Sequence, residues 1–584
     1  MEGQCKIAPT GKWVRILLLH PDDSVHSGPW SGERWDLVID LAWAGRCAYA
    51  DISRKLGCPV RSIQELADPK AHASKLREVL AIGNGCFVDR YGIDWWEFAN
   101  PYRFPILDQI LFVSQLNADF PSHADIIATK PHLLVRILSQ IRSQEIKAFL
   151  PDPHTGSMYA LKRYARILRT FEPASLLQIA FDKWDTHYAL RRWFARVGSS
   201  NGSSKVLQPS AYRNVTRTQA EFARLLPHKE FLSVVTRRDG RLAGLPPNVE
   251  VRSLAGYAPK SISSGTEQEI RQLQQTWTKS TFIKDSMELQ LAEKLGAFKN
   301  FPQFLESGLR VRDAWWAVLE KERISAVLSA DENNPFTRMP ISLARQRNIP
   351  TVYVEHGALN FNLGFREPCS HRYLAHGEML KDYWLRWCHL PEKKITLGAN
   401  VPEQSPEPVK TQRDLIVFFS SEYESAAGRI QDFYREALPR LCALAQKYER
   451  KVVVKLHPFE SMSARRQLIK ETLSSAQLEY LDIRGGPLTN DLLDDTWVAL
   501  TVESSAAVEC AMAGIPVFLC NWFDASWWGY CEQFIRFSVA QALNSPDEIA
   551  GIPNRMPSRE KMLAVRQMLA TPMTSQQFEA TLRL

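Results

Sequence analysis

Uninterrupted runs of apolar residues recur along the chain and predict strands of parallel sheets. The clearest are KVVVKLHP at residues 451–458 and WVALTV at residues 497–502. A continuous β-branched run is typical of a strand buried on both faces of a parallel sheet. The first run should end at His457, because the proline that follows supplies no ladder donor and disfavours helix in the residue before it. His457 is therefore expected at the carboxyl end of a central strand, the edge at which open α/β sheets bind ligands.

A helix is predicted directly after the second run. Ser504 and Ser505 fall where an N-cap belongs, and residues 506–513 are good helix formers that end at Gly514. Free N–H groups, hydroxyls and the positive end of the helix dipole would favour an anion there. His457 would add a further donor from a neighbouring strand end. The sequence therefore predicts a phosphate site.

The HP pair and the SS pair, 47 positions apart, resemble a group of bacterial surface-carbohydrate glycosyltransferases of the GT-B fold. The group includes bacterial sialyltransferases, capsule Kdo transferases and CDP-glycerol glycerophosphotransferases. The resemblance covers residues 324 to 545. It implies an α/β protein with two Rossmann-like domains facing a central cleft, the first enlarged here, and it places His457, Ser504 and Ser505 at the CMP phosphate of a cytidine-activated donor.

Further residues are predicted beside this phosphate site. Ser420 and Ser421 follow the apolar run LIVFF at residues 415–419 and should line the same cleft. Glu503 would hold the ribose hydroxyls or remain a solvated side chain. Lys455 points to the face opposite its neighbour in the strand and would bind a carboxylate or a phosphate.

A strand–helix–strand pattern earlier in the chain predicts a second cluster. ISAVLS at residues 324–329 ends in ADENNPF, and after a helix the strand PTVYV at residues 350–354 ends in EHG. The ends of consecutive parallel strands are neighbours, so Asp331, Glu332 and His356 should meet. The EHG stretch resembles the HG motif of the glycerophosphotransferases, whose histidine is associated with catalysis. Either the imidazole or one of the two carboxylates could be the general base.

Composition limits the class of protein. The 584 residues include 72 basic and 64 acidic side chains, a net charge of +8, with 45% hydrophobic residues. This mild excess suits a nucleotide donor or an anionic membrane surface and is too sparse for a dedicated nucleic-acid binder. Ten scattered cysteines without a CxxC pair predict reduced thiols in a cytoplasmic protein, without zinc. The lack of an Asp-x-Asp pair at the expected place predicts a metal-independent enzyme without a cofactor. Separately, we expect contact with the inner membrane to be peripheral at most.

The length predicts two or three domains. We expect an acceptor-side domain at residues 1–401, a linker at 402–411 around PEQSPEP, a nucleotide-binding domain at 412–550, and terminal helices at 551–584 that return to the first domain. Within the first domain, residues 182–218 should contain a charged and aromatic helix that is followed by a flexible loop at residues 198–204. The adjacent Trp95 and Trp96 would either line an acceptor surface or close the edge of a core.

These features predict a glycosyltransferase of capsule or lipopolysaccharide assembly. It would transfer a sugar from a CMP-Kdo-like or CMP-sialic-type donor to a glycan or lipid-linked glycan acceptor. Four alternatives stay open: a CDP-polyol phosphotransferase, a UDP-sugar-dependent transferase, a UDP-sugar epimerase, and a non-catalytic scaffold that binds polysaccharide.

Overall fold

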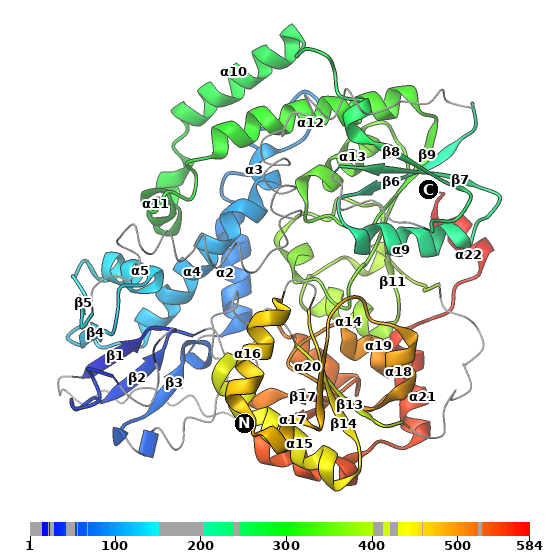
Figure 1. Cartoon of the computed structure of the whole chain (residues 1–584). Coiled ribbons are helices and arrows are strands. Elements are labelled where there is room, and N and C mark those ends of the chain that lie inside the picture. Colours follow the sequence, from blue (N-terminus) through cyan, green and yellow to red (C-terminus); the bar gives the residue numbers. More distant parts are fainter. Residues whose placement is uncertain are drawn as a thin grey trace. The chain divides into compact units, whose positions relative to one another are not determined.

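Three parallel β-sheets carry the fold of the chain (Figure 1). The computed structural model describes residues 14–21, 23, 28–42, 53–54, 56–66, 68–150, 202–236, 244–400, 413–420, 430–457, 460–523 and 528–583. The chain divides into two compact units. One comprises Met1–Ala73, Gln109–Leu176 and Pro406–Arg566, and the other comprises Ser74–Asp108, Leu177–Ser405 and Gln567–Leu584.

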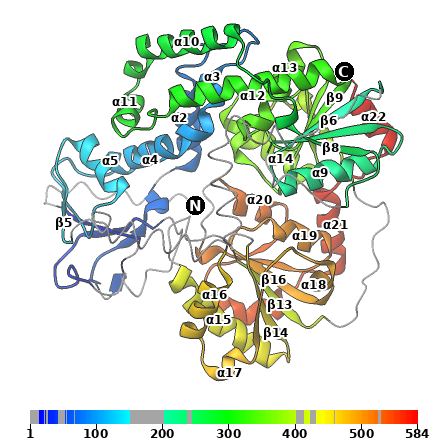
Figure 2. The same cartoon turned by 45° about the horizontal axis from the view of Figure 1, so that its top comes forward.

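The six-stranded sheet of the first unit has the order β15-β14-β13-β16-β17-β18, and every neighbouring pair is parallel. Figure 2 shows β14, β13 and β16 next to one another. The strands are β13 Leu415–Phe419, β14 Lys451–Lys455, β15 Leu481–Arg484, β16 Thr496–Thr501, β17 Val517–Cys520 and β18 Gln541–Leu543. The helices are α15 Ile430–Lys447, α16 Met462–Thr472, α17 Ser475–Leu478, α18 Asn490–Asp495, α19 Ala506–Met512, α20 Tyr530–Arg536 and α21 Arg559–Leu569, with the 3-10 turns η7 Asn521–Phe523 and η8 Pro546–Arg555.

The hydrophobic core of this sheet explains why residues 451–455 form the strand β14 and residues 430–447 form the helix α15. Val452 and Val454 of β14 are fully buried in one cluster with Leu438 and Leu441 of α15. The period of two along the strand and of three to four along the helix brings both apolar faces together. The β-branched run at residues 452–454 therefore becomes a strand buried on both faces, as its sequence predicts.

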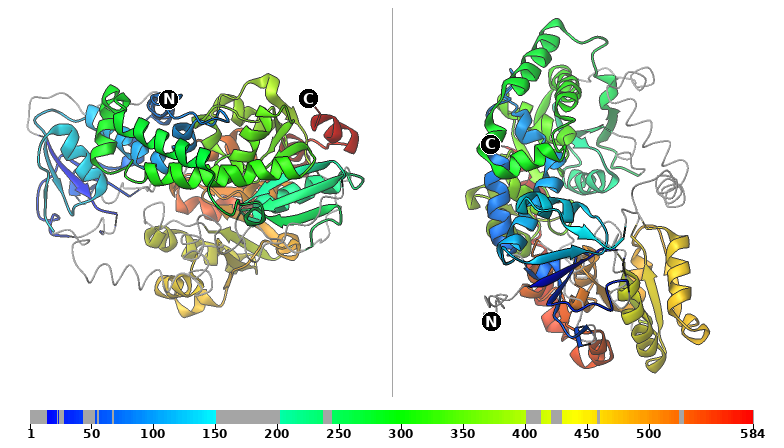
Figure 3. Two further views of the ribbon diagram at one scale, coloured as in Figure 1. Left: turned by 90° about the horizontal axis from the view of Figure 1, so that it is seen from above. Right: turned by 90° about the vertical axis from the view of Figure 1, so that its left-hand side faces the viewer.

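The seven-stranded sheet of the second unit repeats the same plan, in the order β12-β11-β10-β9-β6-β7-β8. Its strands are β6 Lys205–Ser210, β7 Glu230–Val235, β8 Val249–Ser253, β9 Ile324–Ser329, β10 Thr351–Val354, β11 Arg372–Ala375 and β12 Ile395–Leu397. Its helices are α9 Arg213–Arg224, α10 Ser264–Lys279, α11 Met287–Lys294, α12 Phe301–Lys321, α13 Pro335–Gln346, α14 Glu378–Arg386 and α22 Ser575–Thr581, with η3 Leu254–Gly256, η4 Phe282–Asp285, η5 Phe361–Phe365 and η6 Glu392–Lys394. The long helices α10 and α12 lie side by side (Figures 2 and 3).

A third sheet near the start of the chain has five strands in the order β3-β2-β1-β4-β5. The strands are β1 Arg15–Leu19, β2 Leu37–Asp40, β3 Val60–Ser62, β4 Asp125–Ala128 and β5 Lys147–Ala148. The helices of this region are α2 Pro69–Ala81, α3 Trp95–Phe98, α4 Asn100–Ala118 and α5 Leu133–Arg142, with η1 Ile63–Leu66. Each strand of this sheet pairs with its neighbours in parallel.

The predicted α/β class with two Rossmann-like sheets is confirmed, and the five-stranded sheet adds a third layer of the same type. The boundaries predicted at residues 401 and 550 remain a proposal, and the linker at 402–411 lies outside the described residues. In the structure, Met573, Phe578 and Leu582 pack in the core of the seven-stranded sheet. No helix in the described ranges combines the length and the apolar composition needed to cross a bilayer.

Residues 205–210 form β6, a central strand that the sequence did not predict. Pro209 hid it, since proline cannot donate to a ladder and argues against a central strand. The ladder with β9 ends at Leu207, before the proline. Beyond that point the buried Gln219 of α9 donates through Nε2 to the carbonyls of Pro209, at 2.9 Å, and Leu328, at 3.0 Å. A side-chain amide thus joins the two strands where the backbone ladder stops.

Candidate functional site

The strand order of the six-stranded sheet defines its ligand-binding edge. The chain starts at β13, proceeds through β14 to β15 on one side, and then crosses back to β16 on the other side. In sheets with such a reversal, the connections that follow the two central strands run to opposite sides, and ligands bind beside the carboxyl ends of these strands. Ser504 and Ser505 follow β16, and His457 follows β14, one strand beyond β13. With strands about 4.8 Å apart, the ends of β14 and β16 are about 10 Å apart, a gap that a phosphate-bearing group can span between the two side chains.

The structure gives the two serines different roles. The Ser504 hydroxyl accepts from the Ala506 N–H at 3.3 Å, and the Ser504 N–H donates to Thr501 Oγ1 at 3.1 Å. Ser505 is the N-cap residue of α19 without a side-chain cap bond, and its side chain is exposed. Ser504 therefore shapes the loop, and Ser505 presents its hydroxyl outward.

The backbone at the start of α19 offers fewer free donors than the sequence suggests. The N–H groups of Ala507 and Val508 donate to the carbonyls of Ser504 and Ser505 at 3.0 and 2.9 Å. Together with the N–H groups of Ser504 and Ala506, they are engaged inside the loop and the first turn. A phosphate at this edge would therefore be held chiefly by side chains.

Glu460 organises the loop that carries His457, and sequence reasoning missed it. Its side chain is fully buried, and its Oε2 accepts from the His457 N–H at 2.7 Å. Its Oε1 accepts from Ser420 Oγ and from Arg465 Nε, both at 2.7 Å. One carboxylate thus links the ends of β13 and β14 to α16. The available signal was an acidic residue three positions after the histidine, which suits a turn closed by its own carboxylate.

The remaining predicted residues of this edge lie in different surroundings. The hydroxyl of Ser420 is buried between Glu460 and Tyr434, 3.0 Å from the tyrosine hydroxyl. Lys455 donates through Nζ to the carbonyl of Gly486 at 2.5 Å, in the loop after β15, and burial lowers its pKa. Glu503 is half-buried in the loop after β16. Ser421 lies outside the described residues.

His356 lies at the carboxyl edge of the seven-stranded sheet, where the strand order also reverses, between β6 and β9. It follows β10, and its Nδ1 lies 2.5 Å from the carbonyl of Ala330, at the end of β9. Because a carbonyl only accepts, Nδ1 carries a proton, and in the neutral imidazole the lone pair is then on Nε2. The side chain is 28% exposed. The geometry therefore presents an imidazole acceptor in the tautomer that a general base needs.

The loop with Asp331 and Glu332 does come to His356, but the two carboxylates are engaged in local structure. Asp331 Oδ1 accepts from the N–H groups of Asn333 and Asn334 at 2.9 and 3.2 Å, in the loop that precedes α13. Its Oδ2 accepts from Thr337 Oγ1 at 3.2 Å. Asp331 therefore shapes this loop, and both of its oxygens have partners.

Glu332 is turned into a buried polar network. Its Oε2 accepts from the Tyr373 hydroxyl at 3.0 Å and lies 3.7 Å from Arg338 Nη1, and its Oε1 accepts from the Ser370 hydroxyl. Only 1% of the residue is exposed. Of the three candidates for the base, the geometry favours His356.

Glu355 is a further residue that sequence reasoning did not select. Its Oε1 accepts from the N–H groups of His356 and Gly357 at 3.0 and 3.3 Å, and its Oε2 accepts from the Tyr353 hydroxyl at 2.8 Å. Burial raises the pKa of this carboxyl, and the nearby His356 lowers it. Glu355 therefore holds the turn that presents the imidazole, and its place directly before the HG pair was the available signal.

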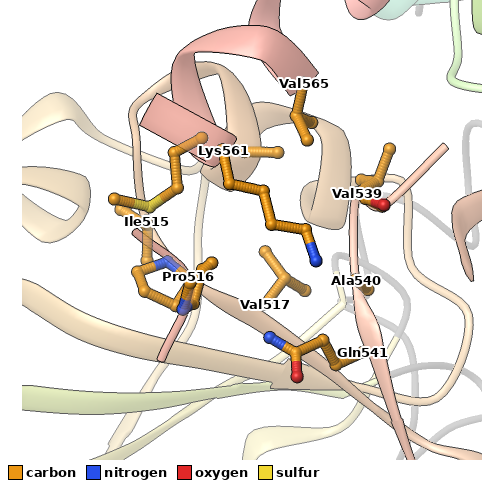
Figure 4. Close-up of a pocket in the computed structure, with 12 residues that line it drawn as sticks. Ile515, Pro516, Val517, Val539, Ala540, Gln541, Lys561 and Val565 are labelled. Carbon is orange, nitrogen blue, oxygen red and sulfur yellow. The ribbon is translucent and has the colours of Figure 1, made fainter. Parts of the chain in front are cut away.

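Two other features lie away from these edges. Trp95 and Trp96 are fully buried, so they belong to the core rather than to an acceptor surface. A small pocket at the amino-terminal ends of β17 and β18 receives Lys561 and Gln541 (Figure 4). Its volume is about 20 Å³, enough for one water molecule. It lies at the edge opposite the predicted phosphate site.

Among the residues that the structure describes, no group of three or more His, Cys, Asp and Glu side chains is arranged to hold a metal ion. The predicted independence from metals and cofactors stays a prediction.

Comparison with known proteins gives remote structural similarity only. No protein-family profile matches the sequence, and no curated protein matches it. The UDP-GlcNAc 2-epimerase of Neisseria meningitidis bound to UDP-GlcNAc is 15% identical with a TM-score of 0.44, covering 65% of this chain and 99% of that one. The UDP-GlcNAc 2-epimerase of Methanocaldococcus jannaschii in complex with UDP-GlcNAc and UDP is 11% identical with a TM-score of 0.37, covering 61% and 94%. CalG4, the calicheamicin glycosyltransferase, is 12% identical with a TM-score of 0.36, covering 65% and 96%. At these values the similarity carries no conclusion about substrate or reaction.

Proposed function

We propose that this chain is a nucleotide-sugar enzyme of the GT-B type. One observation supports the proposal above all: two parallel sheets share a reversing strand order, and the HP, SS and EHG motifs all fall at carboxyl strand ends. That edge is where sheets of this order bind nucleotides and their substrates.

In the proposed mechanism the nucleotide phosphate binds at the carboxyl edge of the six-stranded sheet. His457 and the exposed hydroxyl of Ser505 donate to the phosphate oxygens, and Glu460 fixes the backbone of His457. Donors that are in place before the reaction stabilise the charge that develops on the leaving phosphate.

His356 is the proposed general base at the edge of the seven-stranded sheet. Its Nδ1–H is held by the carbonyl of Ala330, so Nε2 accepts the proton of a substrate hydroxyl. Glu355 keeps the turn in place through the two N–H groups that it accepts.

The finer proposal concerns the donor and the reaction. The HP and SS motifs favour transfer from a cytidine-activated sugar in surface polysaccharide assembly, to a glycan or lipid-linked glycan acceptor. A UDP-sugar enzyme, above all an epimerase, is the second candidate, because sugar-nucleotide epimerases share this fold and have a similar serine or glycine motif at the start of the corresponding helix. A CDP-polyol phosphotransferase and a non-catalytic scaffold remain outcomes of the test.

The test pairs nucleotide binding with turnover. Calorimetry with CMP, CDP and UDP identifies the nucleotide, and release of free nucleotide or inversion at the sugar C2 identifies the reaction. His457→Ala should weaken binding and lower turnover by about 10². His356→Ala should lower turnover by a similar factor and leave nucleotide affinity unchanged within about twofold, since it lies at the other sheet.

His228→Ala is the matched control, because this histidine of the second unit has a side chain that is 60% exposed and pairs with Glu579. It should leave binding and turnover unchanged. Turnover of UDP-sugars alone would reject the cytidine donor. Absence of binding by all three nucleotides at millimolar concentration would reject the enzyme and leave the scaffold.

A further inference from the structure

Arg366 is a cation at the carboxyl edge of the seven-stranded sheet. Among the described residues, its guanidinium makes one hydrogen bond, to a backbone carbonyl. Arg366 follows η5 on the segment between β10 and β11 and is half-buried. Its Nη1 donates to the carbonyl of Glu332 at 2.7 Å. Glu332 comes two residues after Ala330, whose carbonyl holds His356. The guanidinium therefore belongs to the same edge as the proposed base.

None of the described ion pairs includes Arg366, although carboxylates surround it. A guanidinium has five N–H donors in a planar fork, and this one uses a single donor within the part of the chain that the structure describes. Burial and the nearby Arg338 both lower its pKa, to about 10. The fold thus keeps a second positive charge close to a first one, at a cost in desolvation and repulsion.

The surrounding carboxylates cannot neutralise this charge without giving up other partners. Glu97 pairs with Arg338 at 2.7 Å, and Glu332 pairs with Arg338, Tyr373 and Ser370. The two oxygens of Asp331 accept from the loop and from Thr337. The carboxylates of Glu97, Glu332 and Asp331 are therefore engaged elsewhere.

We propose that Arg366 binds an oxyanion, a carboxylate or a phosphate, on the substrate that occupies the carboxyl edge of the seven-stranded sheet. The planar fork matches both groups in a bidentate geometry. Arg366 is then a specificity-determining residue that favours an acidic sugar or a phosphorylated acceptor over a neutral one. The inference rests on the proposed function for the identity of the substrate, but the anion site itself can be tested alone.

The experiment measures binding of inorganic phosphate and of acetate to the full chain by calorimetry at constant ionic strength. The parent protein carries His457→Ala, so that the phosphate site predicted on the six-stranded sheet does not contribute. Arg366→Gln should weaken binding of the preferred probe at least tenfold. Arg366→Lys keeps the charge and loses the fork, so it should retain an intermediate affinity.

Arg323→Gln is the matched control. Arg323 also donates to a carbonyl, that of Gly202 at 2.8 Å, but it precedes β9 and is exposed at the opposite edge of the sheet. It should bind both probes as the parent does. Tighter binding of phosphate assigns the site to a phosphate group, and tighter binding of acetate assigns it to a carboxylate.

Two results would overturn the inference: a parent that binds neither probe at about 50 mM, or an Arg366→Gln variant that binds like the parent. Melting curves of each variant show whether a loss of anion binding is caused by unfolding. If the Arg366→Gln variant does not fold, the anion affinity of the Arg366→Lys variant decides whether Arg366 binds the anion. Nucleotide binding by Arg366→Gln with His457 intact is measured in parallel. If the wild-type protein binds no nucleotide, the proposed function is refuted, whereas the conclusion that Arg366 binds an oxyanion is not affected.

Discussion

Removing the carboxylate of Glu460 should destabilise the first unit far more than removal of a surface charge. The Glu460 side chain is 0% exposed and that of Arg465 is 3% exposed, with 2.7 Å between Oε1 and Nε. Glu460→Ala leaves the buried guanidinium without this carboxylate and leaves the His457 N–H and the Ser420 hydroxyl without their acceptor. Breaking one side of a buried pair costs about 3–5 kcal/mol.

The assay is thermal unfolding of the full chain. For a unit of this size, about 2 °C of melting temperature corresponds to 1 kcal/mol, so Glu460→Ala should lower the transition of the first unit by about 6–10 °C. Hydrogen exchange of the β14 amides assigns the transition to this unit. The matched control is Asp482→Ala, which removes the exposed pair of Asp482 and Arg484 and should cost less than about 1 kcal/mol.

A double-mutant cycle isolates the pair itself. Arg465→Ala combined with Glu460→Ala should cost clearly less than the sum of the two single variants, with a coupling of about 2 kcal/mol or more. A cost of Glu460→Ala no larger than that of Asp482→Ala, or additive single effects, would refute the reasoning.

Two further predictions concern single side chains. Ser504→Ala should lower the free energy of unfolding by about 1 kcal/mol because it removes the acceptor of the Ala506 N–H. Ser505→Ala should instead lower nucleotide affinity and leave the melting temperature nearly unchanged. Equal effects of the two variants on stability would contradict these roles of the two serines. Burial lowers the pKa of His376 below its ordinary value of 6.5, so the folded state favours the neutral ring. The contribution of this neutral ring to the free energy of unfolding is complete above about pH 6.5, and it is lost as the pH falls through the lower pKa of the folded state. His376→Gln can still donate to the carbonyl of Glu355, and its melting temperature should fall less than that of the wild type between about pH 7.5 and about pH 5; an equal fall would show that His376 is not the group that titrates.

Much of the fold is determined locally by the sequence. The β-branched run at residues 452–454 has no stable place except inside a parallel sheet, and the run at residues 415–419 becomes β13 at its predicted bounds. Gly514 follows α19 with φ +65°, the left-handed conformation that glycine adopts after a helix. Residues that follow such strands must lie at a carboxyl edge, which is why His457, Ser505 and His356 could be selected from the sequence.

The tertiary structure decided which of these residues are available for chemistry. Asp331 and Glu332 are acids at a strand end in sequence, but Thr337, Tyr373 and Ser370, which are distant or on other elements, engage their carboxylates. Likewise β6 is a strand because it pairs with β7 along its whole length, and Gln219 joins it to β9 beyond the proline. A local pattern encodes where a strand ends, but the partners of a strand-end side chain come from segments far away in sequence, and only the packed sheets bring them together.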